Sequence, residues 1–161
     1  MIGTAIVLGL AVSVVLTVLI LASLAHNPRL WLGDAPKEMQ KAATPLSKEE
    51  RSLRIKWAVP ILLVMVVVIP IVTFLIHQES PLSFVEAFGF MWIAWTTFNL
   101  VDLVIIDWLV VVRWRPDWSV IREVEHLYHL NTYWFHFKCF LIGTVVITIV
   151  SAILALFVVW F

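Results

Sequence analysis

Four long apolar runs alternate with short polar connections along the chain. A helix needs about 20 apolar residues to cross the hydrocarbon core of a bilayer, and each run reaches that length. The pattern therefore predicts an all-α, polytopic membrane protein in which four transmembrane helices form one bundle. The predicted spans are 2–25, 57–76, 84–112 and 140–161, joined by loops 26–56, 77–83 and 113–139 within a single membrane domain, 1–161.

Two polar motifs predict where helices begin. Ser47 is followed three residues later by Glu50, and Ser83 is followed at the same spacing by Glu86. This is the capping-box pattern, in which each side chain bonds the other residue's backbone N–H. We therefore expect one helix to begin just after Ser47 and run into the second span, and another to begin just after Ser83.

Small residues recur on one face of the first and the last span. Such faces let helix backbones approach closely in lipid, where association depends on packing. We therefore expect both faces to be buried against other helices. The residues are Ala5, Gly9, Ser13 and Thr17 in the first span, and Thr144, Thr148, Ser151 and Ala155 in the last.

The loop before the last span has an amphipathic pattern. Pro116 stops the third span, and Ser119 can cap a helix that runs to about Leu130. The pattern predicts an interfacial amphipathic helix lying on the membrane surface. Its apolar face is Val120, Val124 and Leu127, and its polar face includes Arg122, Glu125, His126 and His129.

Composition and charge add the orientation. Hydrophobic residues make up 62% of the chain, which leaves too little polar surface for a soluble protein of this size. All 11 lysines and arginines lie in loops 26–56 and 113–139. The positive-inside rule places both loops in the cytoplasm and both termini outside, and we expect the inner membrane of a bacterium. A single cysteine, Cys139, excludes an intrachain disulfide and a cysteine-based zinc or iron–sulfur site.

The third span contains acidic residues. The uncharged stretch from Ala87 to Val101 is too short to cross a membrane, so the span must include Asp102 and place Asp107 near its cytoplasmic edge. An aspartate at a helix centre costs roughly 2.5–3.5 kcal/mol, which marks it as a functional candidate. At 100° per residue, Asn99, Asp102 and Arg113 share a face, and Asp107 points about 80° from Asn99. The sequence NLVDLVIID therefore predicts one polar cavity that opens toward the cytoplasm.

Two roles are open for these aspartates. Desolvation and a neighbouring carboxylate favour the neutral form of Asp102, as in a proton carrier or a carboxylate that awaits a cation. In a structural role, Asp102 would bond a tryptophan N–H or a hydroxyl group. Asp107 would then pair with Arg113 or Arg115.

The histidine-rich segment 121–137 offers ligand-like spacings. Glu123 and His126 are three residues apart, and Glu125 and His129 are four apart, so such pairs can converge on one ion on a helix face. A carboxylate from the third span would complete the shell, and the implied cofactor is a divalent metal. The candidate ligands are Asp102, Asp107, Glu125, His126, His129 and His136, and the candidate catalytic residues are Asp102, Asp107, Glu125 and His136.

Three short motifs carry a resemblance. FNLVDLVIIDWL, VEHLYHL and FHFKCFLIG resemble a group of small four-span bacterial integral membrane proteins of no established activity, with an N-x-x-D-x-x-x-x-D-W motif and an FHFKGF-like start to the last helix. The resemblance covers residues 98–143, and Cys139 stands where glycine is expected. It implies that one site contains Asn99, Asp102, Asp107, Glu125, His136 and Lys138.

Three classes of function fit these observations. The first is a membrane enzyme or metal-binding protein with an acidic and histidine site in the cytoplasmic half of the bundle, acting on a lipid or an isoprenoid-like molecule. The second is a small transporter or conductor for protons or cations, and the third is an accessory subunit of a membrane complex. The expected partners are membrane lipids and a homodimer or larger membrane complex, and no nucleic acid is expected.

Overall fold

The computed structural model describes residues 1–160, which contain helices and no strands. Four helical stretches are long and apolar enough to cross a membrane, so the predicted all-α fold with four spans is confirmed. Phe161, the last residue of the predicted fourth span, lies outside the described residues. The long elements are α1 (Ile2–His26), α3 (Lys48–Glu79), α4 (Phe84–Val101) continued by η2 (Asp102–Trp114), and α5 (Tyr133–Trp160). The short ones are η1 (Pro28–Asp34), α2 (Lys37–Ala42), η3 (Asp117–Ser119) and η4 (Arg122–Leu130).

Both predicted capping boxes are present. The Ser47 hydroxyl accepts the backbone N–H of Glu50 at 3.1 Å, and the Glu50 carboxylate accepts the backbone N–H of Ser47 at 2.8 Å. Ser83 and Glu86 exchange the same two bonds. These motifs set the first turns of α3 and α4, and α3 extends beyond the predicted span 57–76 at both ends.

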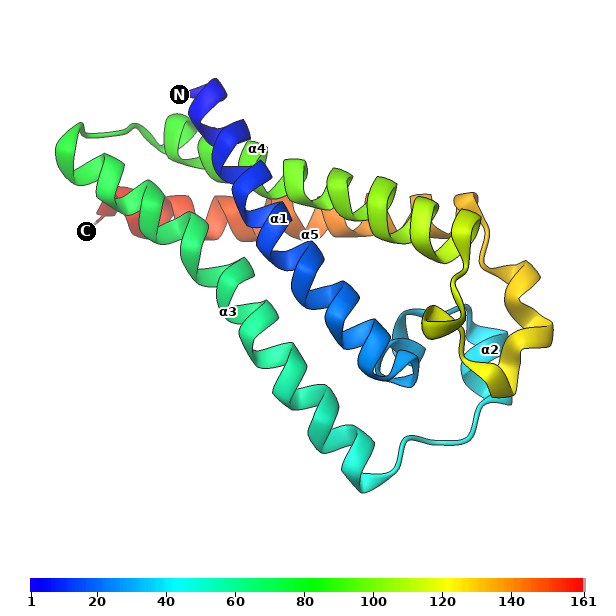
Figure 1. Ribbon diagram of the computed structural model, residues 1–161. Helices are drawn as coiled ribbons and strands as arrows, with labels where there is room; N and C mark the ends of the chain where they lie inside the picture. Colours follow the sequence, from blue (N-terminus) through cyan, green and yellow to red (C-terminus); the bar gives the residue numbers. More distant parts are fainter. Residues whose placement is uncertain (161) are drawn as a thin grey trace.

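Helix α4 lies between α1 and α5, and α3 packs against α1 and α4 (Figure 1). The core between them is apolar and includes the fully buried side chains of Leu16, Ile69 and Met91. The indole N–H of Trp95 donates to the carbonyl oxygen of Met65 at 2.7 Å and so links α4 to α3. The bundle is therefore held by apolar packing with a few hydrogen bonds between helices.

The small-residue face of α1 is buried, as predicted. Ala5, Gly9 and Ser13 face inward, and the closest approach is at Gly9. A Cβ atom added there would lie 2.5 Å from the backbone oxygen of Ala94 in α4. The backbones of α1 and α4 are therefore in direct contact, which only glycine permits at this position.

The small-residue face of α5 is buried only in part. Ser151 and Ala155 are fully buried. Thr148 is exposed, although its hydroxyl accepts the indole N–H of Trp92 at 2.9 Å. The prediction for α5 therefore holds only for the half nearer the C-terminus.

The third span changes its helical geometry at Asp102. From Asp102 to Trp114 the backbone forms a π-helix, and at its end the N–H of Arg115 bonds the carbonyl oxygen of Val110, five residues earlier, at 2.8 Å. Arg115 ends the helix in the left-handed region, with φ 51°, immediately before Pro116. The directions predicted for the side chains of NLVDLVIID assumed α-helical geometry. They are wrong beyond Val101, because the i→i+5 hydrogen bonds of a π-helix put more residues into each turn than an α-helix has.

The two polar connections fold together at one end of the bundle (Figure 1, cyan and yellow). We call this part of the chain the cap, residues 28–42 and 117–130. Its interior is a second apolar cluster, which includes Leu32, Met39, Val124 and Tyr128. The buried Tyr128 hydroxyl accepts the backbone N–H of Ile121 at 2.7 Å and donates to the carbonyl oxygen of Ser119 at 3.2 Å.

The predicted interfacial helix at 120–130 is not a regular α-helix. Arg122–Leu130 consists of 3-10 turns interrupted at Val124, where φ is −119° and ψ is 19°. Val124 is fully buried in the cap cluster. The apolar side of this segment therefore packs on the other half of the cap, and that packing overrides the regular helical period.

Candidate functional site

A cavity of about 460 Å³ lies where the cap meets the bundle. Its walls come from the last turns of α1, from η1 and α2, from η2, from the second half of the cap and from the first turns of α5. Apolar side chains form much of the wall, including Ile20, Leu24, Trp31, Met39, Ile106 and Phe135. Its acidic residues and its histidine are Asp34, Asp102, Asp107 and His136.

Asp107 and His136 form a pair on the wall of this cavity. Nδ1 of His136 lies 3.0 Å from Oδ1 of Asp107, and the histidine side chain is only 8% exposed. A carboxylate accepts hydrogen bonds, so the proton of a neutral imidazole lies on Nδ1 and Nε2 carries the lone pair. Within residues 1–160, Nε2 is buried and has no hydrogen-bond partner. The pair therefore holds an oriented, unused base.

Asp102 lies on the same wall as Asp107 because of the π-helix. In an α-helix, two side chains five residues apart point about 140° away from each other. In η2 the cavity is lined by Asp102, Ile106, Asp107 and Val111, a repeat of four to five residues. The partly buried Asp102 carboxylate has no hydrogen bond or ion pair within the part of the chain that the structure describes.

Asp34 is a third carboxylate on the cavity, and it was not among the predicted site residues. It ends η1 and remains accessible to solvent. The surrounding protein raises the pKa of Asp34 by desolvation, the nearby Arg54 opposes this shift, and the negative charge of Asp107 adds to it. A Gly-Asp-Ala-Pro turn is the one local signal at this position, and it indicates a loop rather than a site.

Three other predicted site residues do not line the cavity. The side-chain amide of Asn99 donates to the carbonyl oxygen of Phe140 and to the hydroxyl of Thr144, each at 3.1 Å, and so ties α4 to α5. Arg113 and Lys138 are exposed. The resemblance implied that Asn99 and Lys138 belong to the same site as Asp102, and the fold does not bring them there.

The predicted ligands of the cap also lie outside the cavity. Glu125, His126 and His129 are exposed and are not among the residues that line it. Glu125 pairs with Arg122 at 3.3 Å, and Nδ1 of His129 lies 3.2 Å from the carbonyl oxygen of His126. The kink at Val124 and the 3-10 turns remove the helical spacing on which their convergence depended.

The six predicted metal ligands are divided between two places. Asp102, Asp107 and His136 line the cavity, whereas the three cap residues do not. Among residues 1–160, no three His, Cys, Asp or Glu side chains lie close enough together to hold one metal ion. The cavity therefore contains one oriented imidazole and carboxylates that do not converge on a single point. This arrangement suits acid–base catalysis better than metal coordination.

No protein-family model, curated protein or solved structure matches this chain.

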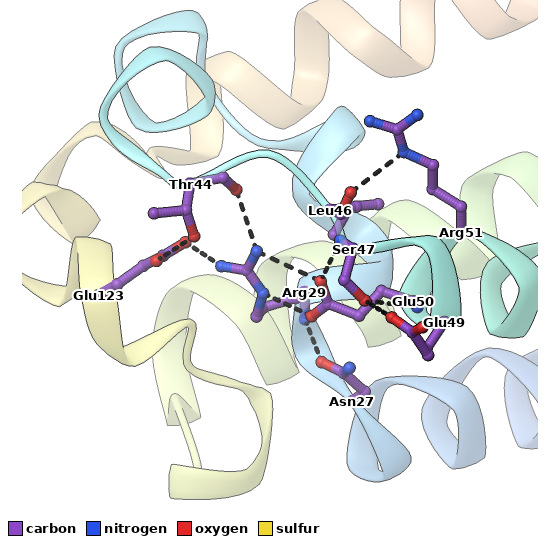
Figure 2. Close-up of polar contacts among 9 residues, drawn as sticks. All are labelled: Asn27, Arg29, Thr44, Leu46, Ser47, Glu49, Glu50, Arg51 and Glu123. Atoms are coloured by element: carbon purple, nitrogen blue, oxygen red, sulfur yellow. Dashed lines mark hydrogen bonds and ion pairs between the residues drawn. The ribbon is translucent and has the colours of Figure 1, made fainter.

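Arg29 is the centre of a cluster of polar contacts that we call the clamp (Figure 2). Its guanidinium bonds Glu50 of α3 at 2.7 Å, the carbonyl oxygen of Thr44 at 3.0 Å and the carboxylate of Glu123 in η4. Glu123 also accepts the Thr44 hydroxyl at 2.9 Å, so this glutamate is a structural partner and not a metal ligand. One side chain thus connects both halves of the cap to the start of α3.

Replacing Arg29 with alanine is expected to loosen the cap without unfolding the bundle. Hydrogen bonds to charged groups are lost, and amide exchange in the cap should accelerate roughly tenfold, equivalent to about 1.4 kcal/mol. Hydrogen exchange followed by mass spectrometry measures this. Arg51→Ala is the matched control, because within residues 1–160 the Arg51 side chain bonds only the carbonyl oxygen of Leu46. Unchanged exchange in Arg29→Ala would show that the apolar cluster alone holds the cap.

The clamp should also weaken in acid. The hydrogen bond from Arg29 is the main cause that lowers the pKa of Glu50 below its usual value. A carboxylate with a lowered pKa contributes stability above its unfolded pKa of about 4.3, and that contribution disappears as the pH falls through the folded value. Cap exchange in the wild type should therefore approach that of Arg29→Ala as the pH falls through the lowered pKa of Glu50.

Proposed function

We propose that this protein is a membrane-embedded enzyme that uses acid–base chemistry on the polar end of a lipid or isoprenoid-like molecule. The observation that carries the proposal is the Asp107–His136 pair on the cavity wall. His136 is buried, and its Nε2 atom has no partner within residues 1–160. A buried polar atom without a partner is costly in a folded protein. A substrate that donates a hydrogen bond to this atom would remove the cost.

His136 is the proposed general base. Its Nε2 atom would accept a proton from a hydroxyl group of the substrate or from a water molecule, and the Asp107 carboxylate would hold the ring orientation and stabilise the imidazolium that forms. A positioned base of this kind contributes typically 10²–10⁴-fold to a reaction rate. Asp102, the second carboxylate on this wall, would bind the substrate beside the reacting group.

The surroundings of the pair favour an amphiphilic substrate. The cavity extends from the polar cap to side chains of the spanning helices, such as Ile20 of α1 and Ile106 of η2. A molecule with an apolar chain could place that chain along these walls and its polar end at His136. By the positive-inside rule we infer that the cap, and with it the reaction, lies on the cytoplasmic side of the membrane, and we propose that this membrane is a bacterial inner membrane.

A cation or proton transporter is the second candidate, favoured by the three carboxylates that share one cavity. Transport needs a path across the whole membrane. The acidic residues of the cavity come from η1 and η2, both at the cap end of the bundle. The enzyme therefore accounts for more of the geometry, because a reaction at one leaflet needs a cavity on one side only.

The proposed enzymatic activity is tested by measuring whether the purified full-length protein consumes a lipid. Wild-type protein is incubated in nanodiscs made from a total bacterial lipid extract, and mass spectrometry compares the lipids before and after. We expect one amphiphile to be consumed by the wild type and His136→Gln to slow this by about 10²-fold or more.

His129→Gln is the matched control, because His129 is exposed and does not line the cavity. It should retain the wild-type rate. An unchanged lipid profile with wild-type protein, or equal rates for wild type and His136→Gln, would refute the enzyme.

A further inference from the structure

The charges around the cavity are unbalanced. Asp34, Asp102 and Asp107 line it, and Lys37 is the only lysine or arginine among its lining residues within the described range 1–160. Asp34 comes from the first half of the cap, whereas the other two come from the third span. The fold therefore brings together carboxylates that are far apart in the sequence, although like charges at one site repel.

The three carboxylates differ in the groups that already compensate their negative charge. Asp107 pairs with His136. Asp34 has the Arg54 guanidinium nearby, which lies against the adjacent Gly33, and Arg54 partly offsets its charge. The Asp102 carboxylate has no ion pair or hydrogen bond within residues 1–160. The side of the cavity near Asp102 is therefore open to a positive group.

A second, independent feature marks the same place as a binding site. The imidazole of His136 is more than nine-tenths buried, lines the cavity and keeps an unpartnered Nε2 atom within the described residues. The buried acceptor, Nε2 of His136, and the uncompensated carboxylate of Asp102 lie on one wall. A ligand that carries both a hydrogen-bond donor and a positive charge would complement them.

An organic cation fits the remaining walls better than a bare metal ion does. No three potential metal ligands converge within residues 1–160, and a cavity of about 460 Å³ is far larger than an ion. Trp31 and Phe135 line the same space, and aromatic rings attract ammonium groups. The apolar side chains of the wall then suit a hydrocarbon chain joined to the cation.

We propose that the substrate is an amphiphile with an ammonium group, whose positive charge is recognised by Asp102 and Asp34. This inference rests on the proposed function and specifies its substrate class. Asp102 and Asp34 bind the ammonium group, the Asp107–His136 pair faces the reacting group, and the apolar wall takes the chain. Asp102 is thus a specificity residue, whereas His136 performs the chemistry.

Three probes of equal chain length test this charge preference. Dodecylamine, which is protonated at neutral pH, is compared with neutral dodecanol and anionic dodecyl phosphate. Binding to the full chain in a non-ionic detergent is measured by native mass spectrometry. We expect dodecylamine to bind roughly tenfold more tightly than dodecanol, because it makes one additional charge-assisted contact. Dodecyl phosphate should bind most weakly of the three.

Variants assign the preference to residues. Asp102→Asn should reduce the affinity for dodecylamine by roughly tenfold and leave that for dodecanol unchanged. Asp34 lies outside the spanning helices, so Asp34→Asn provides a second variant if Asp102→Asn does not fold. Asp117→Asn is the control, because the Asp117 side chain is 90% exposed and lies outside the cavity lining.

The outcomes separate the two proposals. If dodecanol or dodecyl phosphate binds as tightly as dodecylamine, recognition of a cation is wrong, while an amphiphile site and the proposed enzyme remain. If neither aspartate variant changes the preference for dodecylamine, the assignment to Asp102 and Asp34 is wrong. If no probe binds to wild-type protein, both the ammonium substrate and the proposed function are overturned.

Discussion

Replacing Asp107 with asparagine is expected to lower the rate of lipid conversion by about 10²–10⁴-fold while the bundle stays folded. The carboxylate accepts the Nδ1 proton of His136 across 3.0 Å and so keeps the lone pair on Nε2. An asparagine side chain can instead donate to Nδ1, which moves the ring proton to Nε2 and blocks the base. Asp107 is therefore a positioning residue, and the chemistry belongs to His136.

Two measurements distinguish this role from a structural one. The conversion rate in nanodiscs reports the loss of function, and the ¹⁵N chemical shifts of the His136 ring report which nitrogen carries the proton. In Asp107→Asn, the ¹⁵N shift of a protonated ring nitrogen should be found at Nε2 and that of an unprotonated nitrogen at Nδ1, the reverse of the wild type. Asp107→Glu should restore part of the activity, because it returns a carboxylate to the pair.

Glu125→Gln is the matched control for Asp107→Asn, because it also removes a carboxylate at the cap end of the protein. Glu125 was predicted to be a catalytic residue, but it is exposed and pairs with Arg122. Its replacement should change the rate by less than about twofold, since exposed ion pairs contribute little. A loss in Glu125→Gln equal to that in Asp107→Asn would place the chemistry in the cap instead.

The spans and the helix starts were predictable because their signals are local. Hydrophobic length alone identifies a spanning helix. Each capping box is complete within four residues, and both form as expected at Ser47 and Ser83. The small-residue face of α1 was also predictable, since the spacing of Ala5, Gly9 and Ser13 follows directly from helical geometry.

The candidate site was predictable only in part, because its geometry depends on contacts between distant segments. Asp102, Asp107 and His136 were identified from their place in or beside apolar runs, and all three line the cavity. The π-helix that aligns the two aspartates has no signature in the sequence NLVDLVIID. Asp34 enters the site because η1 packs against α1 and α3, a contact between segments that are distant in the sequence.

The histidines of the cap show how packing overrides a local pattern. The period of Val120, Val124 and Leu127 predicted a helix facing lipid, with His126 and His129 opposite. In the structure Val120 and Val124 are buried in the cap cluster, and Leu127 packs against it. The segment bends to fit that cluster, so its histidines stay exposed and the functional histidine is His136 of α5.

The contact between α1 and α4 should be the most sensitive packing point of the bundle, and Gly9→Val tests it. A Cβ atom at residue 9 would lie 2.5 Å from the Ala94 backbone oxygen and 2.7 Å from the Thr97 Cβ atom, so the two helices must move apart. Overpacking of this kind costs typically 1–3 kcal/mol, and we expect about 3 kcal/mol because a backbone atom blocks the side chain. Unfolding by sodium dodecyl sulfate in mixed micelles, followed by circular dichroism, measures this change.

Gly3→Val is the matched control on the same helix. A Cβ atom at Gly3 meets nothing within 4 Å, so this variant shares the change in helix propensity without the clash. Gly9→Val should also weaken dodecylamine binding, because α1 supplies Ile20 and Leu24 to the cavity and would shift as a rigid element. If Gly3→Val and Gly9→Val are equally stable, α1 and α4 are not in direct contact. If only Gly9→Val loses both stability and binding, the packing of the bundle and the shape of the site depend on the same helix contact.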